Sequence, residues 1–280
     1  MLIDFHTHIL PPEVRRRRDH YVGVDPTFAE LYADPKAKMA TAEDLIETMD
    51  SDGIDTSVVM GIGWADPGLA RASNDYIIES VRRHPGRLIG FASVSPTWGD
   101  EAASEADRCA RSGLRGVGEL HPDTQSFDLG DRQTMAPIME AVEEHNLIVT
   151  THSSEPVGHL YSGKGATRPE VLWRFVQSFP EVRIVCAHWG GGLPFYALMP
   201  EVRDGLENVY FDTAASPFLY GPQVFETVAG LIGSERILLG SDFPLLRPGR
   251  LLKQIGESAL PTVEAEAITG SNAATLLGLD

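Results

Sequence analysis

Residues 2–10 read LIDFHTHIL, a short apolar run that ends in two histidines, His6 and His8. Seven further runs of this kind follow, spaced by about 25 to 35 residues, which is the length of one strand–helix–strand step. These runs are residues 56–62, 87–94, 114–120, 146–152, 182–188, 208–212 and 236–242. Each is followed by a longer stretch, mostly amphipathic, so the chain predicts strands that alternate with helices.

Eight such steps in 280 residues predict a (β/α)₈ TIM barrel, formed as a single domain over residues 1–280. A doubly wound parallel sheet is the alternative, but no glycine-rich phosphate turn follows the first strand. The first interval is longer than the others, and residues 9–41 form an insertion that we expect to shape an active site. The segment from Pro261 onward predicts a last helix that packs on the barrel.

The bulk composition excludes several classes of protein. The formal net charge is −17, which disfavours binding to nucleic acid. No apolar run approaches the ~20 residues of a membrane span, and the N-terminus lacks the features of a signal peptide. Cys109 and Cys186 have no metal-ligand spacing, which favours a reducing compartment. We therefore expect a cytoplasmic protein whose partner is a small molecule and not nucleic acid or a membrane, with a homodimer as the default oligomer.

Polar side chains gather at the ends of the predicted strands, where barrel enzymes place their chemistry. They are His6, His8, Glu119, His152, His188 and Asp242. Six such groups without a cation would be costly to desolvate together. Imidazole and carboxylate ligands suit Zn²⁺, with Mn²⁺ or Fe²⁺ as alternatives. On a strand, His6 and His8 share one face, so both can bind the same ion.

The motifs HTH, GEL, TTHSSEP, CAHWGGG and GSDFP, taken in this order, resemble the amidohydrolase superfamily. The resemblance is greatest to the branch with aminocarboxymuconate-semialdehyde-type decarboxylases and many uncharacterised hydrolases. It implies that His6, His8, His152 and Asp242 are metal ligands. His188 would then be an acid/base beside one ion, or a ligand of a second. Glu119 resembles the bridging glutamate of TatD-type nucleases, which implies one or two ions per chain.

Two reactions fit this set of residues, and the leading one is hydrolysis of an amide, lactone or ester by a metal-activated water. In that reaction Asp242 moves the proton and His188 stabilises the oxyanion or binds a second ion. The alternative is a decarboxylase or hydratase for a small carboxylic acid, with Arg247 as the clamp for the carboxylate. Trp189 and His159 are further candidates for substrate binding. A protein that keeps the metal only for structure is a third possibility.

Overall fold

The structure is a computed structural model that describes residues 1–279. Its centre is a sheet of eight strands in the order β1 to β8, with every neighbouring pair parallel. The strands are β1 (Ile3–His8), β2 (Thr56–Met60), β3 (Leu88–Ala92), β4 (Gly116–Leu120), β5 (Ile148–Thr151), β6 (Ile184–Cys186), β7 (Val209–Asp212) and β8 (Ile237–Leu238). This arrangement confirms the predicted (β/α)₈ barrel.

The segment after β8 closes the barrel against β1. The Phe5 N–H donates to Leu239 O at 2.7 Å, and the His8 N–H donates to Phe243 O at 2.7 Å. Between them, the Asp242 N–H donates to His6 O at 2.9 Å. The predicted last strand over residues 236–242 is therefore shorter than expected, because residues 239–243 leave β8 and run along β1 instead. This contact brings Asp242 beside the two histidines of β1.

Alternate strand residues divide between two apolar layers. Val58 and Met60 of β2 belong to a cluster inside the barrel, whereas Val59 packs with residues of the surrounding helices. The inner cluster also contains Phe5 and Phe91, whose rings meet edge to face at 5.7 Å. This alternation is the one that a barrel strand requires, because one face meets the barrel interior and the other meets the helices.

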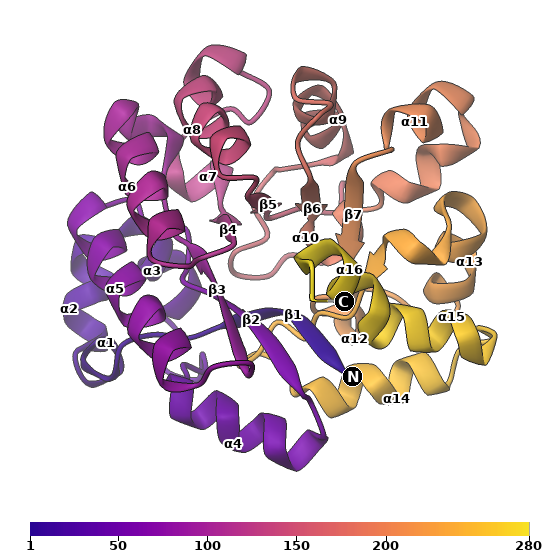
Figure 1. The fold of residues 1–280 in the computed structure, drawn as a ribbon, viewed down its shortest axis with the longest axis horizontal. Helices are drawn as coiled ribbons and strands as arrows, with labels where there is room; N and C mark the ends of the chain where they lie inside the picture. The colour runs from indigo at the N-terminus through magenta and orange to yellow at the C-terminus, as the bar shows by residue number, and fades with distance from the viewer. Residues whose placement is uncertain (280) are drawn as a thin grey trace.

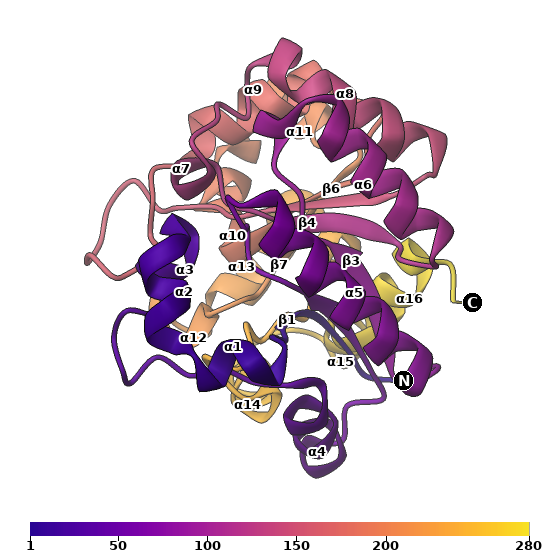
Figure 2. The ribbon, with the colours of Figure 1, turned by 90° about the vertical axis from the view of Figure 1, so that its left-hand side faces the viewer.

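Helices surround the strands (Figure 1). They are α1 (Pro12–Arg16), α2 (Arg18–Val24), α3 (Pro26–Tyr32), α4 (Ala42–Asp52), α5 (Pro67–Arg83), α6 (Asp100–Arg111), α7 (Pro122–Gln125), α8 (Arg132–Glu144), α9 (Pro169–Ser178), α10 (Ala187–Gly190), α11 (Pro200–Gly205), α12 (Ser216–Leu219), α13 (Val224–Ile232), α14 (Pro248–Gly256), α15 (Thr262–Glu266) and α16 (Asn272–Leu277). The first three form the predicted insertion, and Figure 2 shows them at the end of the barrel away from the chain termini.

The predicted C-terminal helix is α16, which covers the opposite end of the barrel. Its residues Ala273 and Leu277 pack in the inner cluster with Ile3. The Arg115 guanidinium donates to Leu277 O at 2.8 Å, and that of Arg183 donates to Leu276 O at 3.0 Å. These donors satisfy carbonyl groups that a helix C-terminus leaves without partners. The helix α16 therefore covers the end of the barrel opposite the insertion.

Two further features of residues 1–279 concern membrane-spanning helices and the two cysteines. No helix within residues 1–279 is long and apolar enough to cross a membrane. Cys109 and Cys186 are both buried and carry free thiols.

Candidate metal centre and active site

The structure brings together all six residues that the sequence placed at strand ends. His6, His8 and Glu119 offer ligand atoms that lie within 4.8 Å of one another, and Glu119, His152 and His188 form a second set of the same kind. Asp242 joins the first set, with Oδ1 3.5 Å from His8 Nε2. The side chains come from β1 and β4, and from the loops after β5, β6 and β8.

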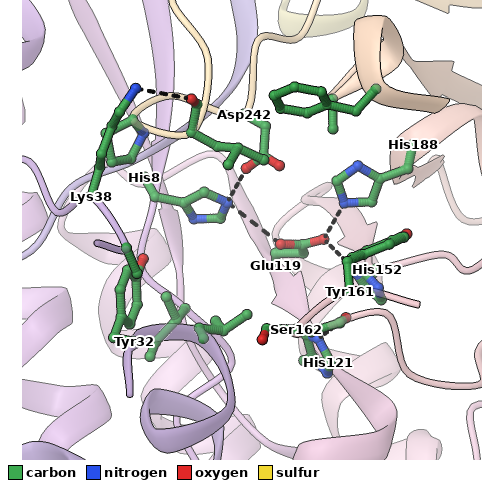
Figure 3. Close-up of a pocket in the computed structure, with 18 of the residues that line it drawn as sticks. His8, Tyr32, Lys38, Glu119, His121, His152, Tyr161, Ser162, His188 and Asp242 are labelled. Carbon is green, nitrogen blue, oxygen red and sulfur yellow. Dashed lines mark hydrogen bonds and ion pairs between the residues drawn. The ribbon is translucent and has the colours of Figure 1, made fainter. Parts of the chain in front are cut away.

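Glu119 lies between the two sets and shows one carboxylate oxygen to each. Its Oε2 is 3.6 Å from His6 Nε2 and 3.5 Å from His8 Nε2. Its Oε1 is 3.2 Å from His152 Nδ1 and 3.5 Å from His188 Nε2. Figure 3 shows this carboxylate at the centre of the group. The arrangement could hold one ion on either side of Glu119, or two ions that share it.

The outward ring nitrogens of the four histidines show that their inward nitrogens are free to bind a cation. Carbonyl oxygens accept hydrogen bonds from His8 Nδ1 (Gly61 O, 2.9 Å), His152 Nε2 (Lys164 O, 3.1 Å) and His188 Nδ1 (Ala214 O, 3.1 Å), and Asp212 accepts from His6 Nδ1 at 2.7 Å. Because a carbonyl can only accept, each of these nitrogens carries the proton in the neutral ring. The lone pairs of the other nitrogens then face inward.

Those inward lone pairs make the site fit a divalent ion. His6 Nε2 and His8 Nε2 are only 3.0 Å apart, and two neutral acceptors at that distance repel each other. A cation between them removes the repulsion. Histidines that bind metals typically donate their other N–H to a carboxylate or carbonyl, as all four do here. The residues present therefore fit a resident metal ion.

The electrostatics of the site also favour a positive charge at its centre. Burial lowers the pKa of His6, but the charges of Asp212 and Glu119 outweigh it and raise that pKa well above its usual value. Burial raises the pKa of Glu119, yet the charge of His6 and the contacts with His152 and His188 hold it well below its usual value. Asp242 is ionised for the same reason, since His8 and His188 outweigh its burial and lower its pKa.

A cavity of about 460 Å³ opens above this cluster. His8, Glu119, His152, His188 and Asp242 form part of its wall, and the insertion supplies another part through residues 31–38. Figure 3 shows Tyr32 and Lys38 of the insertion across the cavity from His188. The insertion over residues 9–41 therefore lies at the site, as predicted, and forms part of the cavity wall.

The structure places only one of the three predicted substrate-binding residues in this cavity. His159 lines it, on the exposed loop after β5. Trp189 is fully buried, donates from Nε1 to Ser216 Oγ at 2.9 Å and packs edge to face on Phe225, so it cannot form a wall of the cavity.

Arg247 is also misplaced by the sequence analysis. Its guanidinium donates to Asp52 at 2.6 Å and to Ser51 at 2.9 Å, just before α14. It does not line the cavity, and its partners already occupy it. Arg247 therefore cannot serve as the carboxylate clamp. The cations that do line the cavity are Lys36 and Lys38.

Four residues of the site were missed by the sequence analysis. Asp212 orients His6, Tyr32 and Lys38 line the cavity, and His121 stacks on His152 with ring centroids 4.4 Å apart. His121 donates from Nε2 to Gly163 O at 3.1 Å. Burial and the neighbouring His152 lower its pKa to about 4, so it is neutral. His121 and Asp212 could have been predicted, because both are polar residues at the ends of the apolar runs that form β4 and β7.

Known proteins resemble this chain over most of its length. A family model described as "Amidohydrolase" matches residues 3–279. The chain belongs to the amidohydrolase family. A curated relative is a 2-amino-3-carboxymuconate-6-semialdehyde decarboxylase from Dictyostelium discoideum, 25% identical over 99% of this chain and 92% of that protein. Another is a gamma-resorcylate decarboxylase from a Polaromonas species, 22% identical over 84% of this chain and 86% of that protein.

Solved structures with the same fold also align with this chain. A 5-carboxyvanillate decarboxylase from Sphingomonas paucimobilis aligns with a TM-score of 0.80 and 19% identity, over 99% of this chain and 98% of that one. A 5-carboxyvanillate decarboxylase from Novosphingobium aromaticivorans, solved with bound manganese, aligns with a TM-score of 0.82 and 18% identity, over 99% and 97%.

These relatives overturn the leading expectation of hydrolysis. The curated proteins that align with this chain are decarboxylases, and they match the alternative that the sequence analysis kept open. The motifs of the superfamily indicate a metal-binding site, and both hydrolysis and decarboxylation can use such a site. The residues that form this metal-binding site therefore do not distinguish the two reactions, and the roles that hydrolysis gave them, proton transfer by Asp242 and stabilisation of the oxyanion by His188, are not carried over to decarboxylation.

Proposed function

We propose that this protein is a metal-dependent, non-oxidative decarboxylase of a small aromatic or unsaturated carboxylic acid. The observation that carries the proposal is that decarboxylases of different acids align with 84% to 99% of the chain. The site supports it, because a cluster of metal-binding groups lies in the wall of a cavity of about 460 Å³, a size that suits a small molecule.

Five residues would hold metal: His6, His8, Glu119 and Asp242 on one side of the Glu119 carboxylate, and His152 on its other side. The ligand set accepts Zn²⁺ or Mn²⁺. When bound, the ion supplies positive charge that fixes the acid and stabilises negative charge as carbon dioxide leaves. We place a tightly held ion on the His6–His8 side of Glu119, with a weaker site on the other side.

His188 is the proton donor in this proposal. Burial lowers its pKa, but the hydrogen bond to Glu119 and the charge of Asp242 raise it to about 9 in the metal-free protein. Its Nδ1 is fixed by Ala214 O, and its Nε2 lies on the cavity side beside Glu119. The carbon that carries the carboxylate takes this proton. The bond to the carboxylate carbon breaks, and carbon dioxide leaves in exchange for one proton.

Lys38 takes the place that the sequence analysis gave to Arg247. The Arg18 guanidinium holds this loop, donating to Asp34 O and to Ala37 O at 2.7 Å each. Lys38 is exposed at the cavity, and its Nζ reaches Leu245 O at 3.4 Å. A cation so placed can attract an anionic substrate to a chain whose net charge is −17.

The Lys38→Ala variant is expected to raise KM for the acid by about 5-fold and to leave kcat unchanged, because an exposed charge contributes about 1 kcal/mol or less. The effect should shrink in high salt, which screens exposed charges. Lys253→Ala is the matched control, since Lys253 is an exposed lysine of α14. An unchanged KM in Lys38→Ala, measured by steady-state kinetics at low salt, would exclude this role.

The direct test of the function is a substrate panel. Protein loaded with Mn²⁺ or with Zn²⁺ is supplied with hydroxybenzoic acids and unsaturated dicarboxylic acids, and also with lactones and esters of similar size. We expect release of carbon dioxide from at least one acid and no hydrolysis of the esters. Hydrolysis of a lactone or ester without decarboxylation of any acid would contradict the proposal.

A further inference from the structure

Asp212 connects two groups of the proposed site and lies at the end of β7. It is fully buried. Its Oδ2 accepts a hydrogen bond from His6 Nδ1 at 2.7 Å. Its Oδ1 accepts two backbone N–H groups at 3.0 Å, from His188 and from Ala214. One carboxylate therefore contacts the ring of His6 and the backbone that carries His188.

The contact with the ring determines which nitrogen of His6 can bind metal. A carboxylate accepts, so the proton of the neutral imidazole is held on Nδ1. The lone pair then lies on Nε2, which faces His8 and Glu119. If Nδ1 instead had to accept a hydrogen bond, the proton would move to Nε2, and the ring could no longer bind a cation there.

The contact with the backbone holds the end of β6 in an unusual conformation. His188 has φ 54° and the next residue, Trp189, has φ 57°, both in the left-handed region that non-glycine residues rarely adopt. The bond from the His188 N–H to Asp212 supports this turn. The neighbouring Gly240 is needed for close packing, because a Cβ there would lie 2.8 Å from His6 Cβ and 3.3 Å from Asp212 Cβ.

We propose that Asp212 is a positioning residue that keeps His6 in the metal-binding tautomer and aligns it with His188. The inference rests on the metal centre of the proposed function. A positioning role and a purely structural role predict different results for two substitutions of Asp212. Asparagine and alanine differ in how they affect the contact with the His6 ring and the contact with the backbone of His188.

In the Asp212→Asn variant, the two backbone N–H groups require the amide oxygen, so the amide NH₂ must face His6 Nδ1. This forces the wrong tautomer on His6. Asp212→Ala removes every bond but leaves the tautomer of His6 free. We therefore expect Asn to be the less damaging change for thermal stability of the metal-free protein and the more damaging change for metal affinity.

The measurement is the Kd for Mn²⁺ and Zn²⁺ by titration calorimetry, together with the melting temperature of each metal-free variant. Loss of a residue that orients a metal ligand weakens metal binding by about 10- to 100-fold, and we expect Asp212→Asn to show this loss. Asp4→Asn is the matched control, because Asp4 is equally buried and bonds to the His6 backbone N–H, but not to its ring.

The outcomes separate the inference from the function on which it rests. If the wild type binds metal and Asp212→Asn binds it with the same Kd, the positioning role is overturned but the metal centre is not. The same rank order of Asn and Ala in stability and in affinity would also overturn it. A wild type that binds neither ion would overturn the metal centre itself. If the variants do not fold, ¹⁵N NMR of the zinc-bound wild type decides, since we expect His6 to carry its proton on Nδ1.

Discussion

Replacement of His8 by alanine is expected to remove the metal and to lower turnover of the acid by at least about 100-fold, the upper range for loss of a supporting residue around a metal. His8 Nε2 lies 3.0 Å from His6 Nε2 and 3.5 Å from both Glu119 Oε2 and Asp242 Oδ1, so it contacts every other group of its half of the site. Metal content by plasma mass spectrometry and turnover should fall together, and a chelator should have the same effect on the wild type.

A surface histidine provides the control. His145 belongs to a different cluster of titratable residues, on the outside of the barrel, where its Nε2 is 2.8 Å from Asp107. His145→Ala should keep both metal and activity. Full activity of the His8→Ala protein, or of chelated wild type, would show that the chemistry does not use the metal centre.

Replacement of His188 by asparagine is expected to lower kcat by about 10²- to 10⁴-fold, the usual contribution of general acid–base catalysis. Asparagine is chosen because it tolerates the left-handed backbone that His188 adopts (φ 54°). The metal should stay bound, since the five proposed ligands remain. Metal content and pre-steady-state kinetics of the variant separate loss of the proton donor from loss of the ion.

The pH profile of the same variant checks the assignment. In the metal-free protein the pKa of His188 is raised to about 9, and the ring loses its proton as the pH rises past its pKa. A metal ion near Glu119 would lower this pKa, so the alkaline limb of kcat should lie at or below pH 9. His188→Asn should lack that limb. An alkaline limb that persists unchanged in the variant would place the proton donor elsewhere.

The fold was predictable because it depends on a pattern that repeats along the whole chain. Eight apolar runs at regular spacing admit few architectures, and the structure has all eight as parallel strands. The bounds were less predictable where the chain makes tertiary contacts. Residues 239–243 look like the continuation of β8, but backbone bonds to β1 hold them outside that strand.

The residues of the site could be predicted from the sequence, but the two-residue period of a strand does not by itself place Glu119 at the cavity. Strand alternation puts Glu119 on the same face as Val117, yet Val117 packs against the helices whereas Glu119 faces the cavity. The register of β4 shifts between Val117 and Leu120, and that of β1 shifts between Asp4 and Thr7. Such irregularities redirect side chains next to active sites, and a simple two-residue period cannot show them.

Long-range partners explain the residues that were wrong or missed. Arg247 lies only five positions after Asp242, but Asp52, far away in the sequence, binds it outside the cavity. Lys38 is far from Asp242 in the sequence, but the fold of the insertion brings it to the cavity. Neither outcome follows from local sequence, because each depends on which distant segments the fold brings together.

The most direct test of the account is to follow an acid labelled with ¹³C in its carboxylate, in D₂O, with metal-loaded enzyme. We expect labelled carbon dioxide to be released and the product to carry one deuterium on the carbon that lost the carboxylate, at a rate that falls in His188→Asn. Retention of the label in a product formed without carbon dioxide, or activity that is equal after removal of the metal, would contradict it.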